Sequence, residues 1–256
     1  MQHPLQRFRL DDKIVLITGA SSGLGVGFAR ATAAVGATVV LAARREDRLT
    51  ALAEELRAGG TTVLTHRTDV SVQQDCQALA AATVAEFGRI DVLINNAGIG
   101  PAAPALRESP DVFTQVIDVN LTGTYWMAHA CAPHMPEGSS IVNIASVLGH
   151  VASRFPQAHY AASKAGVLGL TRDLAQQWSR RRGIRVNALS PGYFASEITD
   201  AEGGHLLRDM VADNSILGRF GEQEELDSAL LFLATPASSY MTGGSLTIDG
   251  GLSAIV

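Results

Sequence analysis

A tyrosine and a lysine stand four residues apart in the segment 157–182, whose periodicity predicts a helix. At this spacing Tyr160 and Lys164 share one face of the helix. A free phenol has a pKa of about 10, and a fixed ammonium group beside it favours the phenolate and lowers that pKa. The pair could then pass a proton to or from a substrate oxygen. Because the same spacing is common on ordinary helix surfaces, the pair by itself does not define a site.

Ser146 stands at the carboxyl end of the predicted strand 140–145, the edge at which ligands bind in parallel sheets. Its hydroxyl can hydrogen-bond a substrate oxygen while Tyr160 transfers the proton. Neither side chain needs to act as a nucleophile if a bound cofactor carries the hydride. No Gly-x-Ser-x-Gly turn surrounds Ser146, which argues against acyl transfer.

A glycine-rich turn, TGASSGLG over 18–25, follows the first predicted strand and opens the first predicted helix. Glycines permit a tight turn and a close ligand approach, and the helix N-terminus offers unpaired amides to a pyrophosphate. The spacing is GxxxGxG rather than the commoner GxGxxG, and a turn that binds nothing is the alternative. The predicted cofactor contacts in this turn are Gly19, Ser21, Ser22, Gly23, Leu24 and Gly25.

The end of the second predicted strand, 38–42, indicates which dinucleotide would bind. An NAD site usually carries a carboxylate here for the ribose hydroxyls, whereas this chain has Ala43 followed by Arg44. A guanidinium suits a 2′-phosphate, and Ser22 can add a hydroxyl donor. NADP(H) is therefore favoured. NAD(H) stays open, because Arg44 and Arg45 could equally be solvated residues at a helix start.

Short β-branched runs alternate with helical stretches along the chain, which predicts an α/β fold with a parallel sheet. No repeat or linker divides the sequence, so we expect a single domain over 1–256. The irregular stretch 191–220 is long enough to form a substrate lid. The predicted strands are 13–18, 38–42, 61–66, 91–95, 140–145, 184–189 and 246–248, and the predicted helices are 23–35, 46–58, 72–87, 110–134, 157–182 and 222–234.

The composition excludes several classes of protein. Apolar residues make up 46% of the chain and the formal net charge is −5, so a large core is expected and nucleic acid is a poor partner. Cys76 and Cys131 form no CxxC pair, which favours buried thiols over a disulfide or a metal site. Neither a signal peptide nor an apolar run of membrane-spanning length occurs, and we expect a cytoplasmic protein without a metal.

Several motifs in one order resemble the short-chain dehydrogenase/reductase family over nearly the whole chain. They are TGxxxGxG at 18–25, NNAG at 95–98, Asp118-Val119-Asn120, Ser146, the Tyr160–Lys164 pair and Pro191-Gly192. The resemblance implies a Rossmann-type, doubly wound fold, with a mostly parallel seven-stranded sheet and helices on both faces. It also implies an oxidoreductase that moves a hydride between NAD(P) and a CH–OH or C=O group. A homotetramer would be typical of such relatives.

The same resemblance implies a role for each matching residue. Tyr160 would be the general acid or base, and Lys164 would lower its pKa and hold the nicotinamide ribose. Ser146 would orient the carbonyl, and Asn120 would seat a water for proton relay. Asp69 would accept a hydrogen bond from the adenine amino group. The further cofactor contacts expected from the resemblance are Val70, Asn95, Ala97, Gly98, Pro191, Gly192 and Ser196.

Apolar side chains near the proposed site indicate a small substrate of the ketone, alcohol or 3-oxoacyl type. The candidate substrate contacts are Val147, His150, Tyr193 and Phe194. These apolar residues could equally pack a lid or a subunit contact. Two other functions stay open: an epimerase or dehydratase that uses the same Tyr-Lys pair, and a non-catalytic dinucleotide sensor. A sensor commonly loses catalytic side chains, whereas Ser146, Tyr160 and Lys164 are all present.

Overall fold

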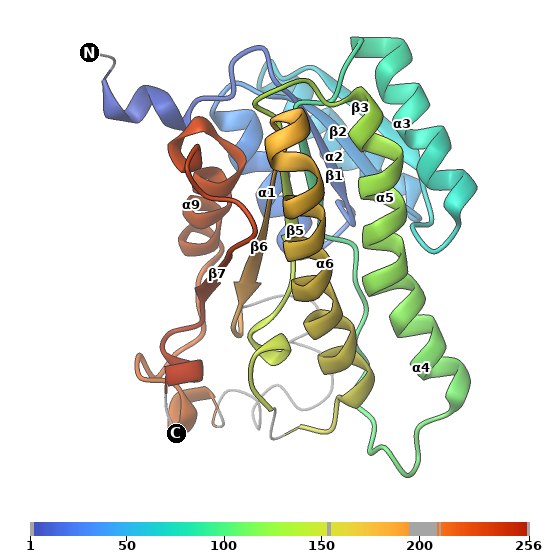
Figure 1. The fold of residues 1–256 in the computed structure, drawn as a ribbon, viewed down its shortest axis with the longest axis vertical. Coiled ribbons are helices and arrows are strands. Elements are labelled where there is room, and N and C mark those ends of the chain that lie inside the picture. The colour runs from blue at the N-terminus through green and yellow to red at the C-terminus, as the bar shows by residue number, and fades with distance from the viewer. Residues whose placement is uncertain (1–2, 153–154, 195–208, 210, 255–256) are drawn as a thin grey trace.

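The computed structural model describes residues 3–152, 155–194, 209 and 211–254. Within them, seven strands form one all-parallel sheet in the order β3-β2-β1-β4-β5-β6-β7 (Figure 1). The strands are β1 Ile14–Thr18, β2 Thr38–Ala43, β3 Val63–Arg67, β4 Val92–Asn95, β5 Ser140–Ile144, β6 Arg185–Pro191 and β7 Ser245–Ile248. The predicted strands are all present, with ends that differ by at most two residues.

Helices cover both faces of this sheet, as Figure 1 shows with α5 and α6 in front of it and α1 and α2 behind. The helices are α1 Leu24–Ala34, α2 Glu46–Ala58, α3 Gln73–Phe87, α4 Pro110–Ile117, α5 Gly123–Cys131, α6 Ala158–Arg182 and α9 Gln223–Ala234. None of the helices formed by the described residues is long and apolar enough to cross a membrane.

The central strand β1 shows why the chain folds into three layers. Its side chains alternate between faces, as in every strand. Val15 and Ile17 pack into the apolar layer beneath α1, α2 and α9, whereas Ile14 and Leu16 pack into the layer beneath α3, α5 and α6. Both faces are buried, so the strand reads as a continuous apolar run. Burial on two faces is what fixes such a strand at the centre of the molecule.

The predicted helix 110–134 has an irregular centre. Between α4 and α5 lies a π-helical turn, Asp118–Thr122, and a short 3₁₀ turn, Ala132–His134, follows α5. The π turn contains Asn120, whose side chain is fully buried. Wide turns of this kind occur often at functional sites, because they shift a side chain out of the regular helical register. Apolar periodicity predicts a helix here without marking the turn.

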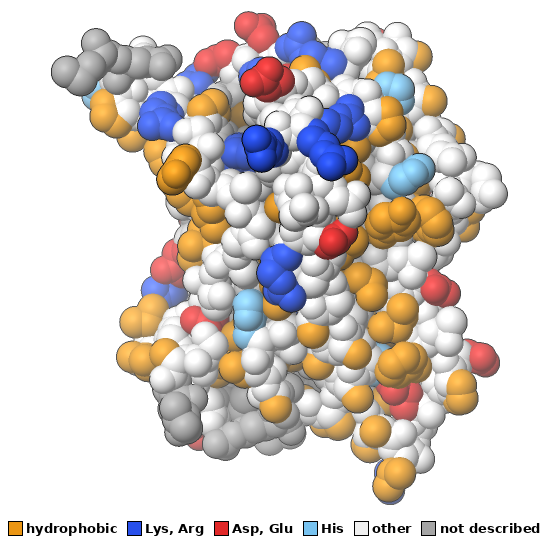
Figure 2. All heavy atoms as spheres, in the orientation of Figure 1, with side chains coloured by type: hydrophobic (Ala, Val, Ile, Leu, Met, Phe, Trp, Pro, Cys, Tyr) orange, Lys and Arg blue, Asp and Glu red, His pale blue; other side chains and the backbone are white. Residues whose placement is uncertain are grey.

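Charge on the molecular surface is distributed unevenly on the face drawn in Figure 2. Lys and Arg side chains gather there around the end of the molecule at which α6 terminates. Three arginines, Arg180, Arg181 and Arg182, occupy the last turn of α6, where cations complement the helix macrodipole. This end is opposite to the carboxyl edge of the sheet, at which α6 begins (Figure 1).

From β1 the chain continues on one side to β2 and β3, and it then returns to the other side of β1 to form β4. At such a switch point the connections leave toward opposite faces, so a crevice opens outside the carboxyl ends of the strands. The glycine turn follows β1 there, and the NNAG motif follows β4. The fold thus brings two segments almost eighty positions apart in sequence to one edge.

Candidate active site

The glycine turn after β1 is packed directly against the NNAG segment. Gly19 has φ of +67°, and a Cβ atom there would lie 2.8 Å from the Cα of Ala97. The Thr18 hydroxyl accepts hydrogen bonds from the backbone amides of Asn96, at 3.0 Å, and Ala97, at 3.1 Å. The Asn96 side chain in turn donates to the carbonyl oxygens of Thr18 and Gly19. These contacts lock the two motifs together, so Asn96 has a structural role.

Helix α1 begins directly after this turn without a side-chain cap. Gly23 occupies the N-cap position, and the first turn of α1 contains no acidic residue. The amides at a helix N-terminus lack intrahelical partners, and the macrodipole gives that end a partial positive charge. An uncapped N-terminus beside a glycine turn fits the pyrophosphate of a dinucleotide. Gly19, Ser21, Ser22, Gly23, Leu24 and Gly25 are the residues that would hold it.

Two arginines stand at the carboxyl end of β2. Arg45 donates to the hydroxyls of Ser22, at 2.6 Å, and Ser21, at 3.2 Å, so it joins β2 to the glycine turn. Arg44 is exposed and lines a cavity of about 330 Å³. The sequence predicts a 2′-phosphate contact for Arg44 alone and assigns none to Arg45. The doubled arginine directly after the strand was the available signal.

The cavity beside Arg44 lies where β2 and β3 end and α4 begins. It is lined by Arg44, Asp69, Ser71, Asp111, Thr114, Gln115, Asp118 and Val119. The Asp69 carboxylate accepts hydrogen bonds from the Ser71 amide, at 3.0 Å, and the Ser71 hydroxyl, at 2.6 Å. The predicted contact Asp69 therefore lies in the wall of this cavity. Val70, the next predicted contact, is buried and does not line this cavity.

Asn95, at the end of β4, turns its side chain into the protein. The Asn95 amide donates to the side chain of Asn143, at 2.9 Å, and to the Thr124 carbonyl, at 3.3 Å, and the residue is buried. A cofactor contact by Asn95 would therefore have to be made by its backbone. Gly98 lies farther out, and a Cβ atom there would lie 3.3 Å from Asn120 Oδ1 and 3.5 Å from Lys164 Nζ.

Tyr160 and Ser146 come together as predicted. Tyr160 lies in the first turn of α6, Ser146 follows β5, and the Ser146 hydroxyl is near enough to the phenol to lower its pKa. Burial raises the pKa of the Tyr160 phenol, the bond with Ser146 opposes that effect, and Tyr193 adds to it. Lys164 is not among the groups that shift this pKa, so the expected lowering by its ammonium is not seen. The Lys164 ammonium is 5.5 Å from the phenol ring centroid and is bonded elsewhere.

Lys164 is held below the phenol by the end of β5. Its Nζ donates to the Ile144 carbonyl at 2.7 Å, and the residue is 4% exposed. Burial lowers the pKa of Lys164 to about 8, because the charged form loses its hydration. Because this pKa is close to neutral pH, an anionic or hydroxyl-bearing ligand beside Lys164 can change the protonation state of its amine.

Asn120 connects three segments from within the π-helical turn. Its Oδ1 accepts from the Ile99 amide at 2.8 Å, and its Nδ2 donates to the Ile99 carbonyl at 2.9 Å and to the Ser163 hydroxyl at 3.0 Å. Both hydrogens of the side-chain amide are donated, so a water held by this side chain would have to donate to the second lone pair of Oδ1. Seating a proton-relay water stays a prediction for Asn120.

The four candidate substrate contacts have different surroundings. Tyr193 is near enough to Tyr160 to affect its pKa, and its ring meets that of Phe220 edge-on at 6.4 Å. Phe194, by contrast, belongs to the apolar core and packs on Gly221, and Val147 is 1% exposed. These two side chains are enclosed by protein rather than presented to a cleft, so the structure does not bring them to the site.

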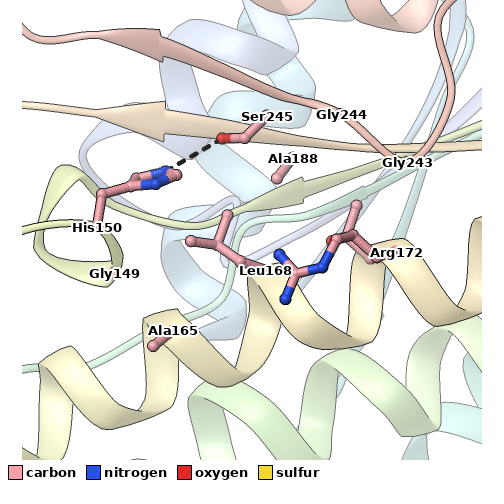
Figure 3. Close-up of a pocket in the computed structure, with 10 residues that line it drawn as sticks. Gly149, His150, Ala165, Leu168, Arg172, Ala188, Gly243, Gly244 and Ser245 are labelled. Atoms are coloured by element: carbon pink, nitrogen blue, oxygen red, sulfur yellow. Dashed lines mark hydrogen bonds between the residues drawn. The ribbon is translucent and has the colours of Figure 1, made fainter.

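His150 faces a different cavity, of about 380 Å³, between α6 and the last two strands (Figure 3). Its Nε2 is hydrogen-bonded to the hydroxyls of Ser190, at 3.1 Å, and Ser245, at 3.3 Å. None of Ser146, Tyr160 and Lys164 lines this cavity. The predicted substrate role of His150 is therefore not matched by its contacts.

The PG turn and the rest of the predicted lid are only partly described. The Gly192 amide donates to the Ile248 carbonyl at 2.8 Å, and Pro191 pairs with Ile248 in the sheet, so this turn is fastened to β7. Ser196 lies outside the described residues, as does half of the predicted lid. No group of three or more His, Cys, Asp or Glu side chains in the described ranges is arranged to hold a metal ion.

The fold and the site together define an oxidoreductase of the dinucleotide-binding α/β class, because a phenol that can transfer a proton lies at the edge that fits a dinucleotide. A family model described as enoyl-(acyl carrier protein) reductase matches residues 19–253. The chain belongs to the short-chain dehydrogenase/reductase family.

Relatives of known activity cover almost the full length of the chain. A 3-oxoacyl-(acyl-carrier-protein) reductase of Thermotoga maritima is 38% identical, with 95% of this chain and 99% of the relative covered. A galactitol 2-dehydrogenase of Cereibacter sphaeroides is 39% identical, with 95% and 96% covered. The crystal structure of a gluconate 5-dehydrogenase of Burkholderia cenocepacia in complex with NADP and tartrate superposes with a TM-score of 0.94, at 38% identity and 99% and 100% coverage.

Proposed function

We propose that this protein is an NADP(H)-preferring reductase or dehydrogenase that acts on a small, predominantly apolar ketone or alcohol, or on a 3-oxoacyl group. The observation that carries the proposal is that the Ser146 hydroxyl acts on the Tyr160 phenol, with Lys164 one helical turn away, at the same carboxyl edge of the sheet as the uncapped start of α1. Retention of all three side chains favours catalysis over a sensing role.

The reaction needs a hydride and a proton. A bound nicotinamide cofactor would supply or accept the hydride. Ser146 orients the substrate oxygen by a hydrogen bond, and Tyr160 donates the proton during reduction and accepts it during oxidation. Lys164, released from the Ile144 carbonyl, would hold the ribose hydroxyls, and its positive charge would favour the phenolate. The raised pKa of Tyr160 suits the acid that donates to a forming alkoxide.

The preference for NADP(H) is supported by the cations at the end of β2. Arg44 is free to turn toward a 2′-phosphate, and Arg45 already reaches the serines of the glycine turn. No carboxylate occupies the position of Ala43, so nothing there would repel a phosphate dianion. The related gluconate 5-dehydrogenase, solved with NADP, is consistent with this choice.

The substrate class is supported by the aromatic character of the described part of the cleft. Tyr193, in edge-on contact with Phe220, gives it an apolar wall near the phenol. The relatives include enzymes named for an acyl group and for polyols or sugar acids, so the family likeness by itself favours no single substrate.

A turnover screen tests the proposal. Apolar ketones, a 3-oxoacyl thioester and a polyol series would each be offered with NADPH and with NADH, and loss of the reduced-nicotinamide absorbance would be followed. We expect turnover of apolar carbonyls with NADPH. Uptake of neither dinucleotide in calorimetry would exclude the function, and turnover of polyols alone would refute the substrate class.

The homotetramer stays a prediction from the family resemblance. Phe113 on α4 and Tyr125 on α5 are 40% and 38% exposed, and such apolar side chains are commonly covered by another subunit. Size-exclusion chromatography with light scattering measures the mass directly, and a monomer at micromolar concentration would contradict the prediction.

A further inference from the structure

Next to the proton donor lies a buried polar residue that the reaction does not use. His159 directly precedes Tyr160 in α6 and is 0% exposed. Its Nδ1 forms an ion pair with the Glu108 carboxylate, whose side chain is 7% exposed. Glu108 ends the segment 99–108 that follows the NNAG motif, which we call the wall segment.

The partners of the His159 ring define where its protons lie. Nε2 is 2.8 Å from the Pro101 carbonyl oxygen, which can only accept, so Nε2 carries a hydrogen. Nδ1 faces a Glu108 oxygen, so a second proton must lie between this nitrogen and the carboxyl group. Both ring nitrogens are thereby bonded to the wall segment, one at its beginning and one at its end.

The wall segment touches Tyr160 at a position where only glycine fits. A Cβ atom on Gly100 would lie 2.6 Å from Cδ2 and 3.0 Å from Cε2 of the phenol ring. Further bonds hold the same stretch to the start of α6: Gln157 Nε2 donates to the Gly100 carbonyl at 3.4 Å, and the Ala103 amide donates to the Pro156 carbonyl at 2.9 Å. The backbone of the wall segment therefore packs against one face of the Tyr160 ring.

Stability alone does not explain a buried ion pair at this place. Removing two charges from water is costly, and a well-packed apolar pair of similar volume is often as stable or more stable. An ion pair with a carbonyl partner does, however, fix one geometry, because both ring nitrogens have a defined bond direction. Fixing one geometry matters most beside a group whose orientation decides proton transfer.

We propose that His159 and Glu108 are positioning residues that hold the wall segment against the Tyr160 ring and so fix the proton donor and the adjoining side of the substrate cleft. The proposal rests on the proposed function for its catalytic consequence. The holding of the wall segment is independent of any turnover and is measured separately.

Three variants of Glu108 and one control separate positioning from general stability. Glu108→Ala removes the partner of Nδ1, and Glu108→Asp withdraws the carboxylate by one methylene. Glu108→Gln restores the contact without charge, because its amide can donate to Nδ1 of a neutral imidazole. Arg107→Ala removes a charge from the same stretch, at an exposed position.

Hydrogen exchange of the peptide covering 99–108, measured by mass spectrometry, reports the holding. We expect Glu108→Ala to raise exchange there by about tenfold or more, Glu108→Asp to raise it less, and the other two variants to stay within about threefold of wild type. With NADPH and the best carbonyl substrate, kcat should follow the same order, while the Kd for NADPH stays unchanged within about threefold.

Each outcome decides the proposal. Unchanged exchange in both Glu108→Ala and Glu108→Asp overturns the holding, and faster exchange with undiminished kcat overturns the positioning role. An equal loss of kcat in Glu108→Gln and Glu108→Ala would assign the effect to the acidic group itself. If Glu108→Ala does not fold, Glu108→Asp carries the same test. A wild-type protein without turnover, yet with the expected exchange pattern, would refute the proposed function and leave the holding standing.

Discussion

Replacing the buried lysine of the site should stabilise the protein while it abolishes function. The chain has only two lysines, Lys13 and Lys164. Burial lowers the pKa of Lys164 from 10.5 to about 8, which, at about 1.4 kcal/mol for each pH unit, means that its charged form costs the folded state about 3 kcal/mol. Lys164→Met keeps an unbranched apolar chain of similar length and removes that cost.

The pH dependence of this effect follows from the two protonation equilibria. Folded Lys164 loses its proton near pH 8, whereas an unfolded lysine keeps it until about pH 10.5. Between these values the unfolded state binds more protons, so the unfolding free energy of wild type rises with pH relative to the variant. The penalty is present in full below pH 8 and disappears as the pH approaches 10.5. From pH 7 to pH 9.5 the difference should move by about 2 kcal/mol toward wild type.

Urea unfolding of both proteins at these two pH values, at one protein concentration, measures the difference. At pH 7 the lost hydrogen bond to the Ile144 carbonyl offsets the gain by about 1–2 kcal/mol, so the absolute advantage of the variant is small. The change with pH does not depend on that offset. Lys13→Met is the matched control, because Lys13 is 46% exposed and paired with Asp91. A difference between Lys164→Met and wild type that is the same at both pH values would refute the reasoning.

Three further substitutions test separate parts of the site. Tyr160→Phe should lower kcat by about 10²- to 10⁴-fold, with the Kd for NADPH within about threefold in calorimetry, and retained turnover would exclude this proton donor. Arg44→Asp should lower the ratio of kcat/KM for NADPH over NADH by about a hundredfold, and an unchanged ratio would refute the 2′-phosphate contact. Gly100→Ala would place a Cβ atom 2.6 Å from the Tyr160 ring, and this overpacking should cost about 1–3 kcal/mol of stability. Both kcat and Tm should therefore fall. Unchanged values would show that the wall segment can move away from the ring without cost.

The fold was predictable because its signals are local. Strands such as β1 are buried on both faces, and α2 shows the amphipathic periodicity of a surface helix, so both stand out from the sequence alone. The π-helical turn around Asn120 was not predictable in this way. Its bonds run to Ile99 and Ser163, which are brought near only by the completed fold.

The parts of the site that depend only on where the backbone runs were predictable from the sequence, and the parts that depend on side-chain direction were not. Ser146, Tyr160 and Lys164 meet because β5 and the start of α6 bring them together, and a strand end displaced by one residue does not change that. Arg44 and Arg45 are more sensitive, because adjacent residues near a strand end point in different directions. The predicted strand ended at 42 and β2 ends at Ala43, which leaves the orientation of the two guanidinium groups undetermined by sequence.

Substrate contacts were the least predictable, because an apolar residue near a cleft looks the same in sequence whether it lines the cleft or packs beneath it. Phe194 was offered as a cleft residue and is instead packed on Gly221, the position to which it is also bridged in the backbone. His150, also a predicted substrate contact, is hydrogen-bonded to serines of the last two strands. Neither contact has a periodic or motif-like signal.

The arrangement of α6 explains how the protein tolerates so much polarity at one place. His159, Ser163 and Lys164 are all buried within the first two turns of this helix, and no side chain caps its start. This end depends on partners from other segments, because its terminus is uncapped and its buried polar groups are satisfied by Pro101, Asn120 and Ile144. The helix continues to Arg182, however, and Leu174 and Ala175 anchor its distant half in the apolar layer beneath α3 and α5. Since helix formation is cooperative, burial at the far end stabilises the near end, where geometry rather than apolar contact is needed. A substitution that removes the packing of Leu174 should therefore also destabilise the first two turns of α6, although Leu174 lies several turns away from them.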